Sequence, residues 1–167
     1  IAIDGACVPP PPGAFLQASA QAEREMAARV VAGAAGARRI ADLFCGLGTF
    51  SLPLSRIAPV TALDADAALL AALAGARGTA GRHPIRTGTR DLFAFPPAPD
   101  ELALFDTIVF DPPRAGARAL SGAIAASRAE RVVAVSCNPA TLARDLAILE
   151  EAGFELSHVA AVDQFVD

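Results

Sequence analysis

Short apolar runs alternate with stretches of helical composition along most of this 167-residue chain. The runs typical of strands are 39–44, 60–63, 85–88, 107–110, 131–136 and 154–162, and the stretches that favour helix are 17–35, 49–57, 65–74, 117–127 and 140–151. This alternation predicts an α/β fold, with a mostly parallel sheet covered by helices on both faces. Loops are expected at the proline-rich stretches 9–13 and 96–99.

The size of the chain indicates one domain, which we place at residues 15–167 behind a Pro-rich leading segment or linker at residues 1–14. The chain opens on Ile1, so we expect it to be a piece of a longer protein. Neither a long uncharged apolar stretch nor a signal peptide is visible, so we expect no membrane span. A net charge of −4 is a poor match to the basic surface of most nucleic-acid binders.

The cysteines are few and widely spaced. Cys7, Cys45 and Cys137 form no Cys-x-x-Cys pair, so neither a metal site nor a disulfide framework is indicated. This usage is typical of the reducing cytoplasm, where we place the protein.

Polar residues follow several of the predicted strands at their carboxyl ends. They are the run Asp42 to Gly48, and then Asp64, Asp91, Asp111 and Cys137. Because ligands bind at the carboxyl ends of strands in such sheets, we expect these residues to line one site.

The run after the first strand has the composition of a cofactor loop. Gly46 and Gly48 let the backbone approach a ligand closely, and the absence of GxGxxG favours a small adenosyl ligand over a dinucleotide. Asp64 is placed to accept the ribose hydroxyls, and Asp91 the adenine amino group. Each carboxylate taken alone could equally be a helix cap or a turn former. Together, in this order, they indicate S-adenosylmethionine.

Cys137 is a candidate nucleophile because it lies between a strand and a helix start. Asn138 is a good N-cap and Pro139 suits the first helical position. The helix dipole and the free N–H groups there favour a thiolate. The alternative is an inert buried thiol, which is the role we expect for Cys45.

Asp111 begins an Asp-Pro-Pro-Arg turn at the end of another predicted strand. Two prolines stiffen the turn, so Asp111 can point rigidly into the cleft. Methyltransferases that act on base amino groups carry similar turns, so this motif does not choose the substrate. A purely structural turn is the other reading.

The chain resembles the S-adenosylmethionine-dependent RNA uracil-5-methyltransferases, which make 5-methyluridine in tRNA and rRNA. The matching runs are FLQ (15–17), DLFCGLGTF (42–50), DPPRAG (111–116) and SCNPATLARD (136–145). The resemblance implies a Rossmann-like class I methyltransferase fold and an RNA substrate, which is rRNA or tRNA. It also implies a Cys137 nucleophile that forms a covalent adduct with uracil C6. The cofactor site that it implies is lined by Gln17, Phe44, Thr49, Asp64, Asp91 and Asp111.

The chain departs from the family pattern in two ways. Ser19, Thr49 and Asp91 stand where asparagine is usual or common, which are mild polar exchanges. Members also continue into a His-x-Glu motif, which supplies the general base, and into a last strand. We therefore expect this chain to lack the last strand, to bind cofactor with little turnover, and to present an open sheet edge that could dimerise.

The amino-terminal RNA-binding domain and the iron–sulfur cysteines of some members are absent too. Cys7 alone cannot hold a cluster. We expect contacts with RNA to come mostly from domains outside this chain.

Two other functions remain open from the sequence. A base-amino methyltransferase using Asp111 would need no thiolate and would tolerate the loss of Cys137. A non-catalytic adenosyl-binding module would bind cofactor without ever forming an adduct with RNA.

Overall fold

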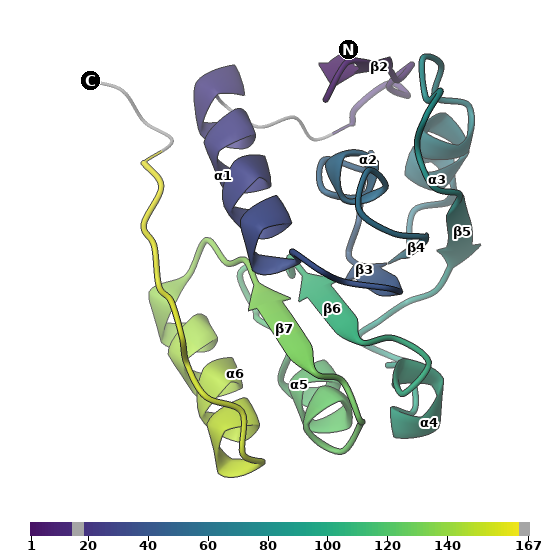
Figure 1. The fold of residues 1–167 in the computed structure, drawn as a ribbon. Helices are drawn as coiled ribbons and strands as arrows, with labels where there is room; N and C mark the ends of the chain where they lie inside the picture. The colour runs from purple at the N-terminus through teal and green to yellow at the C-terminus, as the bar shows by residue number, and fades with distance from the viewer. Residues whose placement is uncertain (15–18, 164–167) are drawn as a thin grey trace.

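A five-stranded parallel sheet forms the centre of the molecule (Figure 1), in a computed structural model that describes residues 1–14 and 19–163. The strands are β3 (Ile40–Leu43), β4 (Val60–Asp64), β5 (Ile85–Thr89), β6 (Thr107–Phe110) and β7 (Arg131–Ala134). Their order is β5-β4-β3-β6-β7, and every neighbouring pair is parallel. The predicted α/β fold is confirmed.

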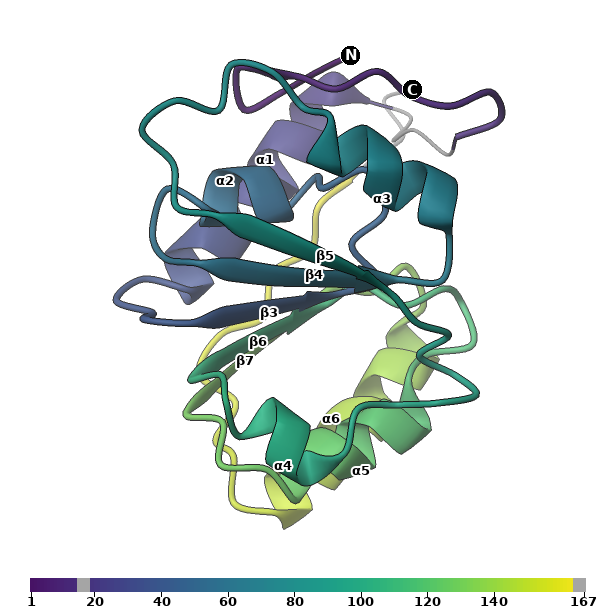
Figure 2. The same cartoon turned by 90° about the vertical axis from the view of Figure 1, so that its right-hand side faces the viewer.

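Helices cover both faces of the sheet, as Figure 2 shows with the strands seen edge-on. One face carries α1 (Ala20–Gly33), α2 (Ser51–Leu54) and α3 (Ala67–Ala74), and the other carries α4 (Pro99–Leu102), α5 (Arg118–Ala125) and α6 (Pro139–Glu151). Successive residues of a strand point to opposite faces, so Ile40 joins the first core while Ala41 joins the second. The sheet is thus buried on both sides, which explains its apolar strands.

A hairpin of β1 (Ala2–Ile3) and β2 (Ala6–Cys7) precedes the sheet and packs on the first core. Ile3 and Val8 are fully buried, and Asp4 accepts hydrogen bonds from Arg56 and Arg82. The sequence did not predict this hairpin. The division into a linker at residues 1–14 and a domain at 15–167 stays a prediction.

The carboxyl-terminal segment differs from the prediction. A strand was expected at residues 154–162, but these residues form no strand, and Figure 1 shows them outside the sheet. The prediction is wrong because an isolated extended segment gains no ladder hydrogen bonds, and a strand needs a neighbour. Leu156 and Val159 are accordingly exposed. A second difference is the short helix α4, which begins at Pro99 within the expected loop.

The sheet order creates a switch point between β3 and β6. From β3 the chain continues through α2 to β4, whereas from β6 it continues through α5 to β7 on the opposite side. The two connections diverge and leave a crevice at the carboxyl ends of these strands, where ligands of such folds bind.

Candidate functional site

An open hollow lies at the carboxyl ends of the strands and gathers most of the predicted site residues. Its lining includes Phe44, Gly46, Thr49, Asp64, Asp91, Asp111 and Cys137. Gly48 is not part of that lining, and Gln17 lies outside the described residues. The hollow also continues along the free side of β7.

The loop after β3 has the backbone of a ligand cradle. Phe44 and Gly46 have positive φ values of 63° and 53°, and a Cβ on Gly46 would meet no atom within 4 Å. Gly46 therefore leaves room for a ligand against the backbone. Gly48 differs, because a Cβ there would lie 2.4 Å from Leu73 Cδ1, so this glycine lets the loop pack closely against α3.

Asp64 and Asp91 both accept hydrogen bonds from backbone N–H groups. Asp64 accepts through Oδ2 from Gly46 at 2.8 Å and through Oδ1 from Asp66 at 2.9 Å, which fixes its carboxylate at the glycine loop. Asp91 Oδ1 accepts from the N–H groups of Phe93 and Ala94 at 2.9 and 3.0 Å. Asp91 is thus a turn former and also part of the hollow's lining.

An aromatic pair that the sequence reasoning missed stands between these two loops. The rings of Phe44 and Phe93 lie 5.2 Å apart between centroids and are tilted by 50°. Phe93 is 49% exposed, so the pair offers an apolar surface to the hollow. The signal for it was an apolar residue two positions after Asp91.

Buried negative charge lies next to the hollow. Asp42 is fully buried; its Oδ2 accepts from Ser51 Oγ, and its Oδ1 has no partner among the described residues. Burial raises the pKa of Asp42 to about 7; the Ser51 hydrogen bond opposes this rise, and the charges of Asp111 and Asp64 add to it. Burial also raises the pKa of Asp111 to about 6.

Cys137 stands immediately before α6 and is exposed. The side chain of Asn138 caps the helix by accepting from the Ala140 N–H at 3.0 Å, as predicted. The thiol of Cys137 is therefore not buried, and its role as a nucleophile stays a prediction. Cys45 is 5% exposed, and burial raises the pKa of its thiol well above the usual range, which confirms that this cysteine packs in the core.

Within residues 1–14 and 19–163, no three His, Cys, Asp or Glu side chains come together in a way that could hold a metal ion. None of the helices in this described part is long and apolar enough to cross a membrane.

Comparison with known proteins finds similarity to RNA methyltransferases. Residues 100–167 match the tRNA (uracil-5-)-methyltransferase family. The chain is 52% identical over 160 residues to an uncharacterised RNA methyltransferase of Brucella suis, covering 95% of this chain. It is 38% identical over 157 residues to the 23S rRNA (uracil(1939)-C(5))-methyltransferase RlmD of Chromohalobacter salexigens, covering 92% of this chain and 32% of that protein.

The chain is similar in sequence to RNA uracil-5-methyltransferases. The resemblance predicted from its motifs is confirmed. The chain spans 39% of the length of the Brucella suis relative, about two fifths, so both sequence matches concern one part of a longer protein.

Solved structures confirm the fold. The tRNA (uracil-54, C5)-methyltransferase of Pyrococcus abyssi, in complex with S-adenosyl-L-homocysteine, superposes with a TM-score of 0.69 at 25% identity, over 83% of this chain and 34% of that one. The ribosomal protein L11 methylase of Lactobacillus delbrueckii also superposes with a TM-score of 0.69, at 18% identity over 92% of this chain and 78% of that one, which concerns the fold alone. The chain has the Rossmann-like fold of class I methyltransferases.

Proposed function

We propose that this chain is the cofactor-binding and nucleophile-bearing part of an RNA (uracil-5-)-methyltransferase. Its reaction moves a methyl group from S-adenosylmethionine to C5 of a uridine in rRNA or tRNA. The observation that carries the proposal is that the glycine loop, Asp111 and the exposed Cys137 follow the carboxyl ends of the adjacent parallel strands β3, β6 and β7, and all three border one open hollow.

The residues of the hollow fit a cationic adenosyl ligand. Gly46 leaves open space beside the backbone, and Asp64 and Asp91 supply fixed oxygen acceptors. The buried Asp42, which interacts electrostatically with Asp64 and Asp111 of the lining, adds negative charge near this site in its ionised form. A sulfonium ligand is stabilised by such charge. When bound, S-adenosylmethionine supplies an electrophilic methyl group.

Cys137 begins the chemistry. Its thiolate adds to C6 of the uracil, forming a C–S bond while the C5=C6 π electrons move to make C5 nucleophilic. C5 then takes the methyl group, whose bond to the sulfonium sulfur breaks, so that S-adenosylhomocysteine would leave as a neutral thioether. A base then removes the proton from C5, the C6–S bond breaks, and the thiolate returns. The uridine must leave its base stack to reach the hollow.

Asp111 holds the uracil in this scheme. Its carboxylate follows β6 at the switch point, and the two prolines after it fix the direction of the turn. In its ionised form the Asp111 carboxylate accepts a hydrogen bond from the N3–H of uracil and keeps C6 within reach of Cys137. The sequence of the chain contains no His-x-Glu, so we propose that these 167 residues alone bind the cofactor without turnover.

The partner is RNA, held mostly by other parts of the full protein. The net charge of −4 supports this division, because phosphate contacts require basic groups. We also include in the proposal a dimer through the open edge of β7. The cytoplasmic location stays a prediction.

Substitution of Cys137 tests the proposed function in the intact protein that contains this sequence. Cys137→Ala should abolish methyl transfer to a uridine-containing RNA and leave cofactor affinity within about twofold, because the thiol reacts with the base rather than with the cofactor. The matched control is Cys7→Ala, which removes another exposed thiol, one outside the lining of the hollow.

The other candidate functions give different results in the same assay. Methylation that survives Cys137→Ala and appears on a base amino group would identify a base-amino methyltransferase. Cofactor binding without any transfer by the intact protein would identify a non-catalytic module.

A further inference from the structure

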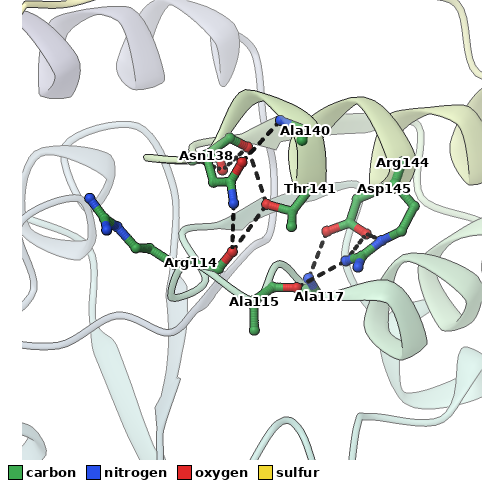
Figure 3. A network of polar contacts seen from close by, with 9 residues as sticks. Arg114, Ala115, Ala117, Asn138, Ala140, Thr141, Arg144 and Asp145 are labelled. Atoms are coloured by element: carbon green, nitrogen blue, oxygen red, sulfur yellow. Dashed lines mark hydrogen bonds and ion pairs between the residues drawn. The ribbon is translucent and has the colours of Figure 1, made fainter.

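A network of polar contacts joins the turn after β6 to the start of α6 (Figure 3). Asp145 is 1% exposed; its Oδ2 accepts from the Ala117 N–H at 2.6 Å, and its Oδ1 accepts from Arg144 Nε and Nη2 at 2.9 and 2.6 Å. Arg144 Nη2 also donates to the Ala115 carbonyl at 3.1 Å. An ion pair between the buried Asp145 and the partly exposed Arg144 thus contacts two backbone groups of the facing turn.

The first turn of α6 adds two more contacts to the same segment. Asn138 Nδ2 donates to the Arg114 carbonyl at 3.2 Å. Thr141 Oγ1 lies 3.3 Å from that same oxygen and 3.1 Å from the Asn138 carbonyl, and its single proton is shared between the two. Figure 3 shows the Arg114 side chain extending away from α6, so only its backbone takes part. We call the four side chains of Asn138, Thr141, Arg144 and Asp145 the latch.

Gly116 shows how closely the latch and the turn approach. It has a φ of +74°, and a Cβ there would lie 2.5 Å from Arg144 Nη2, 2.6 Å from Asp145 Oδ2 and 2.8 Å from Thr141 Cβ. Those distances are too short for any real side chain, so only glycine permits the contact. The contact is therefore specific in shape as well as in hydrogen bonding.

The latch connects the two groups to which the proposed function assigns the chemistry on the base. The turn that it holds begins at Asp111, and the helix to which it belongs begins at Pro139, two residues after Cys137. When the Asp111 turn is held against α6, the direction from which the Cys137 thiol approaches a base bound at Asp111 is fixed as well. Misplacement by about 1 Å can cost on the order of a hundredfold in rate.

We propose that Arg144 and Asp145 are positioning residues for methyl transfer, because the buried Asp145 carboxylate and the Arg144 guanidinium paired with it hold the Asp111 turn against the helix that follows Cys137. This inference rests on the proposed function. It predicts that weakening the latch slows attack on the base and leaves cofactor binding intact, since none of its contacts reaches the glycine loop.

Asp145→Asn is the sharpest variant. Both carboxylate oxygens of Asp145 accept hydrogen bonds, one from the Ala117 N–H and the other from Arg144. In the variant the side-chain NH₂ of the asparagine must face one of these donors, so that hydrogen bond is lost. In the intact protein we expect the rate of covalent capture of a 5-fluorouridine RNA to fall at least about tenfold, with cofactor affinity within about twofold. Gly116→Ala should behave in the same way.

Glu151→Gln is the matched control, because it removes an exposed carboxylate at the end of the same helix. Arg144→Lys should lower the capture rate less than Asp145→Asn does. Lysine keeps the positive charge beside Asp145 but cannot donate from two nitrogens as Arg144 does. A structural role alone would lower cofactor binding and folded fraction together with the capture rate. That joint loss, or capture at the wild-type rate in folded Asp145→Asn, would overturn the proposal.

Hydrogen exchange separates this inference from the proposed function. The latch predicts faster exchange of the Ala117 amide in Asp145→Asn than in Glu151→Gln, whatever reaction the protein performs. If the wild-type protein captures no RNA, the proposed function is wrong. In that case the positioning role for methyl transfer falls with it, and unchanged exchange would also rule out the latch itself.

Discussion

At the scale of single residues, the most unusual feature is the pair of aspartates, Asp42 and Asp111, whose pKa values rise most on folding among the carboxyl groups of the described residues. Asp42 and Asp111 are drawn out of water at the switch point, and no basic side chain is among the groups that shift their pKa values. Proteins place such perturbed groups at functional sites more often than elsewhere. The cost of burying Asp42 and Asp111 is consistent with a site that serves a cationic ligand.

The stability of the protein should therefore fall as pH rises from 5 to 8. The pKa of Asp42 is about 7 and that of Asp111 about 6 in the folded chain, above the ordinary value of 3.8. In this window the folded state binds more protons than the unfolded state, so each deprotonation removes stability. Chemical denaturation should show a loss of at least about 2 kcal/mol in the free energy of unfolding across the window.

The Asp42→Asn variant is the control for this pH dependence. Asparagine cannot ionise and still offers an oxygen to Ser51, so its stability should vary less with pH than that of the wild type. An equally steep pH dependence in the variant would mean that Asp42 is not the group responsible.

At the scale of elements, the sequence predicted those strands and helix ends that hydrophobic periodicity and turn residues determine. The five strands and the cap of α6 follow from apolar runs and from Asn138. The hairpin of β1 and β2 was missed because two-residue strands carry no periodic signal. The strand expected at residues 154–162 failed because strand formation depends on a partner, which local sequence does not show.

The site divides in the same way. The strand ends placed Asp64, Asp91, Asp111 and Cys137 at one hollow, because the carboxyl ends of parallel strands share one edge. Contacts that depend on packing between elements were not predictable. Asp145 was part of a matched motif, but its contact with the Ala117 N–H joins residues that are 28 positions apart.

The two glycines of the cofactor loop should respond differently to alanine. Gly48→Ala should lower the free energy of unfolding by about 2 kcal/mol or more, because its Cβ meets the buried Leu73 and its φ is +88°. Gly46→Ala should lower the free energy of unfolding by only about 1 kcal/mol. Its Cβ enters the hollow, however, so it should weaken cofactor binding at least about tenfold.

Calorimetric titration and chemical denaturation of both variants measure this contrast. The prediction is contradicted if Gly46→Ala binds cofactor as the wild type does, or if it loses more stability than Gly48→Ala.

At the scale of the whole molecule, the sheet of the described residues ends in two edge strands, β5 and β7, and the hollow follows the free side of β7. Among the described residues β7 pairs only with β6, and its side chains from Val132 to Ala134 are half-buried. The hollow continues along this side. Unpaired N–H and C=O groups on such an edge are a template for another strand.

We expect the 167-residue chain to self-associate through this edge, and Ala134→Pro to prevent it. The Val135 N–H donates to Phe110 of β6, so by alternation the Ala134 N–H points to the free side and its loss spares the ladder. Sedimentation at rising protein concentration measures the effect. A wild-type chain that remains monomeric throughout would contradict the edge as an interface.

The central claim is that the Cys137 thiol adds covalently to a uracil, and one measurement tests it directly. The intact protein is incubated with cofactor and a 5-fluorouridine RNA, denatured and digested, and the peptides are analysed by mass spectrometry. Because C5 carries fluorine in place of the proton that the base removes, the adduct cannot eliminate and should persist. We predict a nucleotide linked to the peptide that carries Cys137. A linkage at any other residue, or no linkage while uridine RNA is still methylated at C5, would contradict the account.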